Sequence, residues 1–141
     1  MKQLISIFIF TSICLSHYAQ KINVHVKKLA WIDKDLFSNS VIEQGEKEVD
    51  ATYTFDLKKK KLHFINKERD IDKDTEILDF NLKDGIYNIV YKDVYRFDES
   101  IVWYPTAIID PANHSMSMIF PEPPRNLIGI DYFKDFVVTI K

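Results

Sequence analysis

Hydrophobic and polar residues alternate along most of the chain after its first segment. The alternation is clearest in residues 22–27, 52–57 and 136–140, where Ile, Val, Tyr, Phe and Leu occupy every second position. A period of two places successive side chains on opposite faces of a β-strand. No stretch keeps a helical period for long. We therefore expect an all-β domain, or a mainly β domain with one short helix, whose antiparallel strands form a small barrel or sandwich of about seven to nine strands.

The pair Asp84-Gly85 predicts a two-residue hairpin turn, because both central positions of such a turn need a positive φ. Counting outward from this turn assigns one apolar face to the two strands. The pairs on that face are Leu82 with Tyr87, Phe80 with Ile89, and Leu78 with Tyr91. A shift of one residue would mix apolar and polar positions, so we expect this face to be buried.

A second hairpin is expected around the lysine run at residues 58–61. Its predicted pairs are Leu57 with Leu62, Phe55 with Phe64, and Asp56 with His63. The four lysines could form a basic patch for a polyanion, but acidic residues lie close to them in the sequence. We interpret the run as a solvated turn.

The remaining segments are assigned more coarsely. Strands are expected near 100–110 and 114–120, with Pro105 marking an edge strand or a bulge because proline cannot donate to the sheet. Residues 32–48 are polar and predict a loop, with a short helix around 41–47.

The start of the chain has the layout of a secretory signal peptide. Lys2 precedes an apolar run at residues 4–15, and the small residue Ala19 follows. This run is shorter than the roughly 20 residues that a membrane-spanning helix needs. We predict a signal peptide at 1–19, a single β domain at 20–141, and no transmembrane segment in the mature chain. The leader resembles those of Gram-negative exported proteins, which implies a periplasmic or extracellular location.

Composition excludes several functions. The chain has 19 Lys and Arg against 21 Asp and Glu, so it lacks the basic excess of nucleic-acid binders and we expect no nucleic-acid partner. Its one cysteine, Cys14, lies in the predicted leader, which leaves the mature chain without a thiol nucleophile or a disulfide. The three glycines do not cluster, so phosphate loops and dinucleotide fingerprints are absent. No cofactor is expected.

Two patterns resemble metal sites. Residues 70–74 alternate Asp with other residues as a calcium loop does, but Thr75 replaces the required glycine, and we interpret the segment as a charged loop. His114, Met116 and Met118 recur at a period of two and could hold Cu(I), which prefers soft ligands. We favour the alternative that both methionines fill the core, because Phe120 continues the apolar stripe.

Aromatic residues gather between positions 87 and 104. Four of them are candidates for an exposed ligand or partner surface, namely Tyr95, Phe97, Trp103 and Tyr104. The favoured function is therefore non-catalytic binding of a protein partner or of an apolar or sugar ligand. Copper binding through His114, Met116 and Met118 is one alternative, and a hydrolase with a carboxylate site is another.

Overall fold

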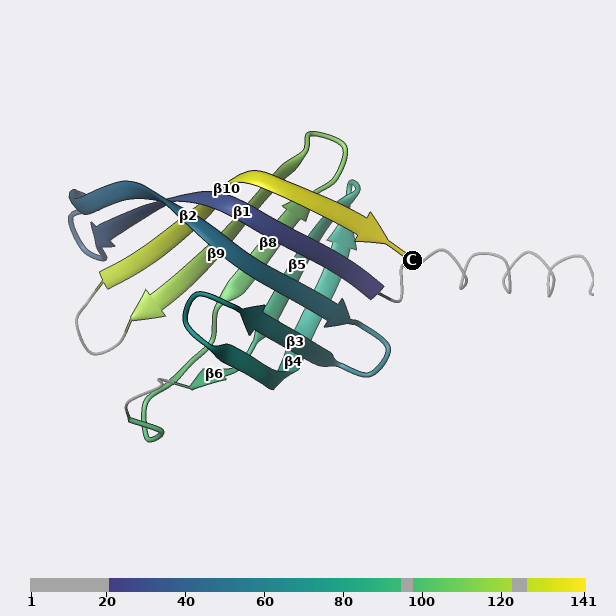
Figure 1. Cartoon of the computed structure of the whole chain (residues 1–141). Helices are drawn as coiled ribbons and strands as arrows, with labels where there is room; N and C mark the ends of the chain where they lie inside the picture. Colours follow the sequence, from purple (N-terminus) through teal and green to yellow (C-terminus); the bar gives the residue numbers. More distant parts are fainter. Residues whose placement is uncertain (1–20, 95–97, 123–126) are drawn as a thin grey trace, which may run out of the picture.

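The protein is a closed antiparallel β-barrel. The structure is a computed structural model that describes residues 21–94, 98–122 and 127–141. Across these residues, eight strands close in the order β1-β10-β9-β8-β5-β4-β3-β2, and no helix is present (Figure 1). The all-β prediction is confirmed, and of the two expected architectures the chain adopts the barrel. No helix in the described ranges is long and apolar enough to cross a membrane.

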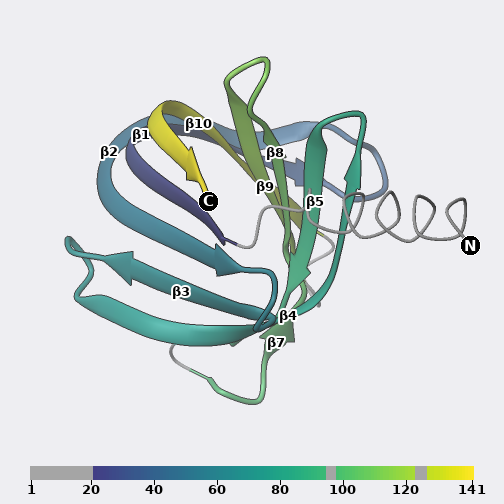
Figure 2. The same ribbon diagram turned by 90° about the vertical axis from the view of Figure 1, so that its right-hand side faces the viewer.

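The barrel is a simple meander. Its strands are β1 (Lys21–Asp35), β2 (Val41–Asp56), β3 (Lys61–Asn66), β4 (Ile71–Lys83), β5 (Ile86–Tyr91), β8 (Thr106–Asp110), β9 (Ser115–Glu122) and β10 (Leu127–Ile140). The short strands β6 (Asp93–Val94) and β7 (Val102–Trp103) pair with each other outside the barrel sheet. Figure 2 views the barrel with β1, β2 and β10 on one side and β5, β8 and β9 on the other.

The first and last strands close the barrel. The backbone N–H of Lys21 donates to the carbonyl of Lys141 at 3.0 Å, and the N–H of Lys141 donates back at 2.9 Å. Pairing then continues along nearly the whole of β1 and β10. Closure leaves no unpaired barrel edge, which removes the usual route to edge-to-edge aggregation.

The hairpin between β4 and β5 has the predicted register next to its turn. Leu82 pairs with Tyr87 and Phe80 pairs with Ile89. Asp84 and Gly85 have φ values of 54° and 79°, as a primed turn requires. The turn chemistry therefore determined this register correctly.

The predicted pairing of Leu78 with Tyr91 is wrong. The register shifts between Ile77 and Asp79, so Ile77 faces Tyr91. Ile77 is completely buried, whereas Leu78 is 39% exposed. The bulge adds one residue to β4 and bends the strand around the barrel. β1 has a similar shift after Val26.

The predicted register of the lysine hairpin is also wrong, by two residues. Phe55 pairs with Leu62, Tyr53 with Phe64, and Asp56 with Lys61, while Thr54 faces His63. The Asp56 carboxylate accepts the N–H of Lys59 at 2.9 Å, and Lys60 has a φ of 51°. This local bond places the turn over residues 57–60. A shift of two leaves the same side chains facing inward, and the lysines of the turn are exposed as expected.

Residues 32–48 contain no helix and little loop, which corrects the sequence prediction. β1 continues to Asp35, and β2 begins at Val41. The Asp35 carboxylate holds the turn between them by accepting the N–H groups of Phe37 and Ser38, at 3.0 and 2.7 Å. Most residues at the start of β2 are exposed, so no apolar alternation was needed there to make a strand.

Pro105 lies between two strands. It separates β7 from β8, and β8 is not an edge strand because it pairs with both β5 and β9. The Pro105 carbonyl accepts the N–H of Tyr91 at 3.1 Å. The proline therefore breaks the segment predicted near 100–110 into two strands.

The interior side chains fill only part of the barrel. We call the part near the two chain ends of the sheet, Lys21 and Lys141, the filled end. Several side chains that are at most 2% exposed pack there or in the adjoining core, including Ile22, Val24, Phe55, Ile89, Ala107, Ile109, Met116 and Met118. We call the part near the turn at 67–70 and the strands β6 and β7 the cavity end.

Candidate functional site

A cavity of about 650 Å³ occupies the cavity end of the barrel. It is lined by residues of β1 to β7, of the turn at 67–70, and of β9 and β10. Pockets that bind small molecules typically measure about 300–1,000 Å³. An eight-stranded barrel is just wide enough either to be filled by its own side chains or to hold one small ligand. Side chains fill this barrel at one end, and a cavity remains at the other.

The walls of the cavity are mainly apolar and aromatic. The apolar and aromatic lining residues are Leu29, Val49, Ala51, Tyr53, Leu62, Phe64, Ile71, Tyr91, Val94, Trp103 and Phe120. Most occupy inward positions on their strands. The Tyr53 ring packs against Phe64 with centroids 4.6 Å apart, and against Phe133 at 5.6 Å. These contacts fix part of the wall as a rigid aromatic surface.

Two phenol groups give the apolar wall some polarity. The Tyr91 hydroxyl donates to the thioether sulfur of Met118 at 3.6 Å, which is a weak acceptor. Burial raises the pKa of both Tyr53 and Tyr91, and the negative charges of Asp131 and Asp93 raise each pKa further. Both hydroxyls therefore stay neutral and can donate hydrogen bonds.

One ion pair crosses the cavity lining. Lys73 on β4 donates to the carboxylate of Asp93 on β6 at 2.5 Å, and the same carboxylate oxygen accepts the N–H of Val94 at 2.9 Å. The side chains of this pair are 38% and 25% exposed. Each charge is thus matched locally, and the pair ties β6 to the barrel wall.

The other charged lining residues lie closer to solvent. Lys47, Glu68 and Arg69 are exposed residues that also line the cavity. Their exposure shows that the cavity opens to solvent beside the turn at 67–70. The buried Asn66 side chain accepts the backbone N–H of Arg69 at 3.1 Å and so shapes this turn.

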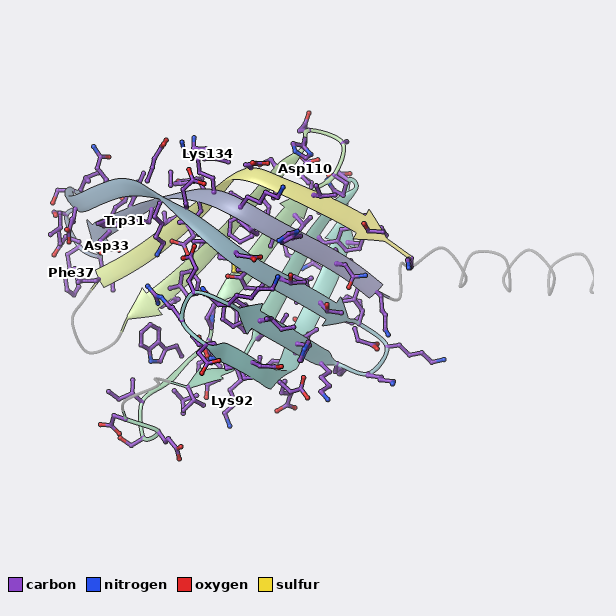
Figure 3. The ribbon with its side chains drawn as sticks, viewed as in Figure 1. Trp31, Asp33, Phe37, Lys92, Asp110 and Lys134 are labelled. Carbon is purple, nitrogen blue, oxygen red and sulfur yellow. The ribbon has the colours of Figure 1, made fainter. Side chains whose placement is uncertain are left out.

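Asp131 on β10 is the most perturbed carboxyl group of the lining. Burial, the largest cause, raises its pKa from 3.8 to about 6, and the charge of Asp33 adds to this effect. Lys47 and Arg69 oppose it through their positive charges. These neighbours act through their charges alone, because no described side chain contributes a hydrogen bond to this carboxyl group. Figure 3 shows Asp33 beside Trp31 near the end of β1, away from Asp110 at the opposite end of the molecule.

The predicted aromatic surface residues do not share one location. Trp103 is half-buried and lines the cavity, whereas Tyr104 is 54% exposed and is not part of the lining. Tyr95 and Phe97 lie outside the described residues. Of the two described members, only Trp103 joins the candidate site.

The predicted copper ligands are divided between the core and a turn. Met116 and Met118 are 2% and 0% exposed, as expected for core residues. His114 lies in the turn before β9 with a φ of 47°, and its ring stacks on Phe136 at 4.4 Å. Among the described residues, no group of three or more His, Cys, Asp or Glu is arranged to hold a metal ion.

The acidic segment at 70–74 is not a charged loop, contrary to the sequence prediction. Most of it belongs to β4, with Asp72 and Asp74 pointing outward and Lys73 toward the cavity. His63 on the neighbouring strand lies 2.7 Å from Asp74 and 3.5 Å from Asp72. The alternation of acids in the sequence therefore reflects the outer face of a strand.

Sequence reasoning missed the polar residues of the cavity. Asp131, Lys73 and Asn66 each share a strand face with apolar residues, since they lie two positions from Phe133, Ile71 and Phe64, respectively. A polar residue on an apolar stripe was the available indication. It could be used only once strand bounds were known, and residues 70–74 had been predicted to form a charged loop.

Comparison of the chain with family models, curated proteins and solved structures finds no match. The functional argument therefore starts from the cavity itself.

Proposed function

We propose that the protein binds a small, mainly apolar ligand inside the barrel and does not transform it. The observation that carries this proposal is the cavity of about 650 Å³ at one end of a barrel whose other end is packed. An unfilled apolar space forfeits packing contacts that a ligand would restore. Apolar and aromatic residues make up most of the lining, which favours an apolar ligand over a sugar.

The test uses intrinsic fluorescence. The chain has two tryptophans, of which Trp103 lines the cavity and Trp31 does not. In a Trp31→Phe background, titration with a fluorescent fatty-chain probe should quench Trp103 emission, and excess dodecanol should restore it. Saturable one-to-one binding supports the proposal, and the absence of binding contradicts it.

A matched pair of variants locates the binding. Ala51 lies on β2 and faces the cavity, whereas its neighbour Thr52 faces away because adjacent strand residues point to opposite sides. Ala51→Phe should fill part of the space and weaken probe binding at least tenfold. Thr52→Phe should leave the affinity within about twofold. Equal effects of the two changes would place the probe elsewhere.

Hydrolysis is a second candidate, and one observation favours it. Besides Glu68 at the rim, Asp93 and Asp131 line the same cavity, and hydrolases often use a charged and a neutral carboxyl group together. Asp93 is held by Lys73 and the backbone of Val94, which favours a structural role. A product detected by mass spectrometry after incubation with esters or glycosides, and lost in both Asp93→Asn and Asp131→Asn, would favour catalysis.

We also propose that the protein is exported to the periplasm or beyond, because its first residues follow the order of a signal peptide. Mass spectrometry of the exported form should place its N-terminus within about two residues of Gln20. Recovery of only the intact chain, starting at Met1, would contradict export by cleavage.

A further inference from the structure

We propose that the cavity selects an amphiphile in which an apolar chain ends in a protonated amine, with Asp131 as the partner of the amine. This inference rests on the proposed binding function and adds the chemical class of the ligand. It follows from the place of Asp131 in the cavity lining and from the fact that no described side chain donates a hydrogen bond to its carboxyl group.

The ion pair on β4 and β6 leaves no net charge. Lys73 and Asp93 are in direct contact at 2.5 Å. A ligand carboxylate that approached Lys73 would have to compete with Asp93, and a ligand amine that approached Asp93 would have to displace Lys73. This pair therefore does not select either sign of ligand charge.

Asp131 differs from this pair because its opposite charges are not in contact. Besides burial, three charges act on its pKa without a hydrogen bond, with Lys47 and Arg69 lowering it and Asp33 raising it. Asp131 is half-buried, and a charge that is only partly hydrated and has no hydrogen bond is costly. An ammonium group inside the cavity could donate directly to this carboxylate and remove much of that cost.

The positive residues of the lining do not provide an equivalent site for an anion. Lys47 and Arg69 belong to the exposed rim, where solvent weakens the interaction of separated charges. A ligand carboxylate that followed its chain into the cavity would also meet the charge of Asp131. The buried half of the cavity thus favours a cation, and the phenol groups of Tyr53 and Tyr91 have no charge at neutral pH.

The groups that face Asp131 determine how binding depends on pH. They are Asp33 from β1, Lys47 from β2 and Arg69 from the turn at 67–70, while Glu68, the Lys73–Asp93 pair, Tyr53 and Tyr91 share the cavity. The pKa of about 6 means that Asp131 is mostly ionised at neutral pH and mostly protonated below about pH 5. An amine should therefore bind less tightly in acid, although it stays protonated itself.

The experiment compares dodecylamine, dodecanol and dodecanoate by displacement of the fluorescent probe at about pH 8. Dodecylamine should bind roughly tenfold to hundredfold more tightly than dodecanol, as a charge-assisted hydrogen bond implies. Dodecanoate should bind least tightly. In Asp131→Asn, the advantage of the amine over the alcohol should disappear while the affinity for dodecanol stays the same.

Asp33→Asn is the matched control, because it removes the same charge from a neighbouring residue that does not line the cavity. It should keep the preference for the amine and should move the loss of amine binding to lower pH. In Asp131→Asn the amine affinity should show no such pH dependence.

The outcomes separate the two proposals. If the alcohol binds and the amine is no better, or if the preference survives in Asp131→Asn, the ligand class is wrong and the binding function stands. If none of the three compounds binds, both proposals fail. Circular dichroism of each variant checks that it is folded.

Discussion

Replacing Asp131 by asparagine should make the barrel more stable at about pH 8. Burial raises the pKa of this carboxyl group from 3.8 to about 6. Ionisation is therefore harder in the folded chain than in the unfolded one. Below the pKa of the unfolded chain, the carboxyl group is protonated in both states and costs the folded protein no stability. As the pH rises through about 6, this group ionises in the folded protein too, and the free energy of unfolding falls progressively to its lower value.

The expected size follows from the two pKa values. A difference from 3.8 to about 6, at roughly 1.4 kcal/mol per pKa unit, corresponds to a loss of about 3 kcal/mol when Asp131 is fully ionised. Asparagine has a similar shape and does not ionise. The gain in free energy of unfolding from Asp131→Asn should be about 3 kcal/mol at about pH 8 and about 1 kcal/mol at about pH 4.5.

The assay is urea unfolding of both proteins, followed by circular dichroism at a series of pH values. The surface carboxyl groups with lowered pKa, such as Asp50 and Asp74, occur in both chains, so their contributions cancel in the difference. Asp33→Asn should give a smaller gain, because it only removes a repulsion that Asp131 feels. A gain that does not change with pH, or a destabilised variant at about pH 8, would refute the reasoning.

Three further predictions concern the packing and the turns. Met118→Ala should cost about 2–5 kcal/mol of stability, because Met118 is 0% exposed. Phe80→Ala should cost less, because Phe80 is only partly buried. The denaturation midpoints of the two variants give the comparison. Gly85→Ala should cost about 1–2 kcal/mol through its φ of 79° alone, since an added Cβ meets no atom within 4 Å, and the same unfolding assay measures it. Gly45→Ala should change the fluorescence of Trp31, because the new Cβ would lie 3.1 Å from the indole ring; an unchanged emission spectrum would contradict this contact.

The barrel strands could be predicted wherever apolar alternation or turn chemistry was explicit. The register between Phe80 and Ile89 followed from Asp84-Gly85, because the turn type allows little choice. The same reasoning failed at Leu78, where a bulge changes which residue faces inward. A bulge arises from the need to bend a strand around the barrel, and that need depends on strands that are distant in sequence.

The candidate site was largely beyond prediction from sequence. Trp103 was singled out for its aromatic ring, but Asp131 is one of many acids and becomes distinct only by its burial. A cavity is a space left by residues from many strands, and its volume depends on how far each side chain reaches across the barrel. Alternation identifies the inward face of a strand, but it does not tell whether that face meets another side chain or an open space.

The pairing of β1 with β10 also determines when this protein can finish folding. These strands are the most distant in sequence among those described, and their contact encloses the rest of the barrel. Forming it requires the loss of entropy that comes with joining the two ends of a long chain, and folds dominated by such non-local contacts fold slowly. Until β10 is in place, β1 and β9 each present an open edge that can pair with another molecule. The interval between synthesis of β1 and docking of β10 is therefore the period in which this chain is most prone to aggregate, and the finished barrel owes its protection to the last strand added.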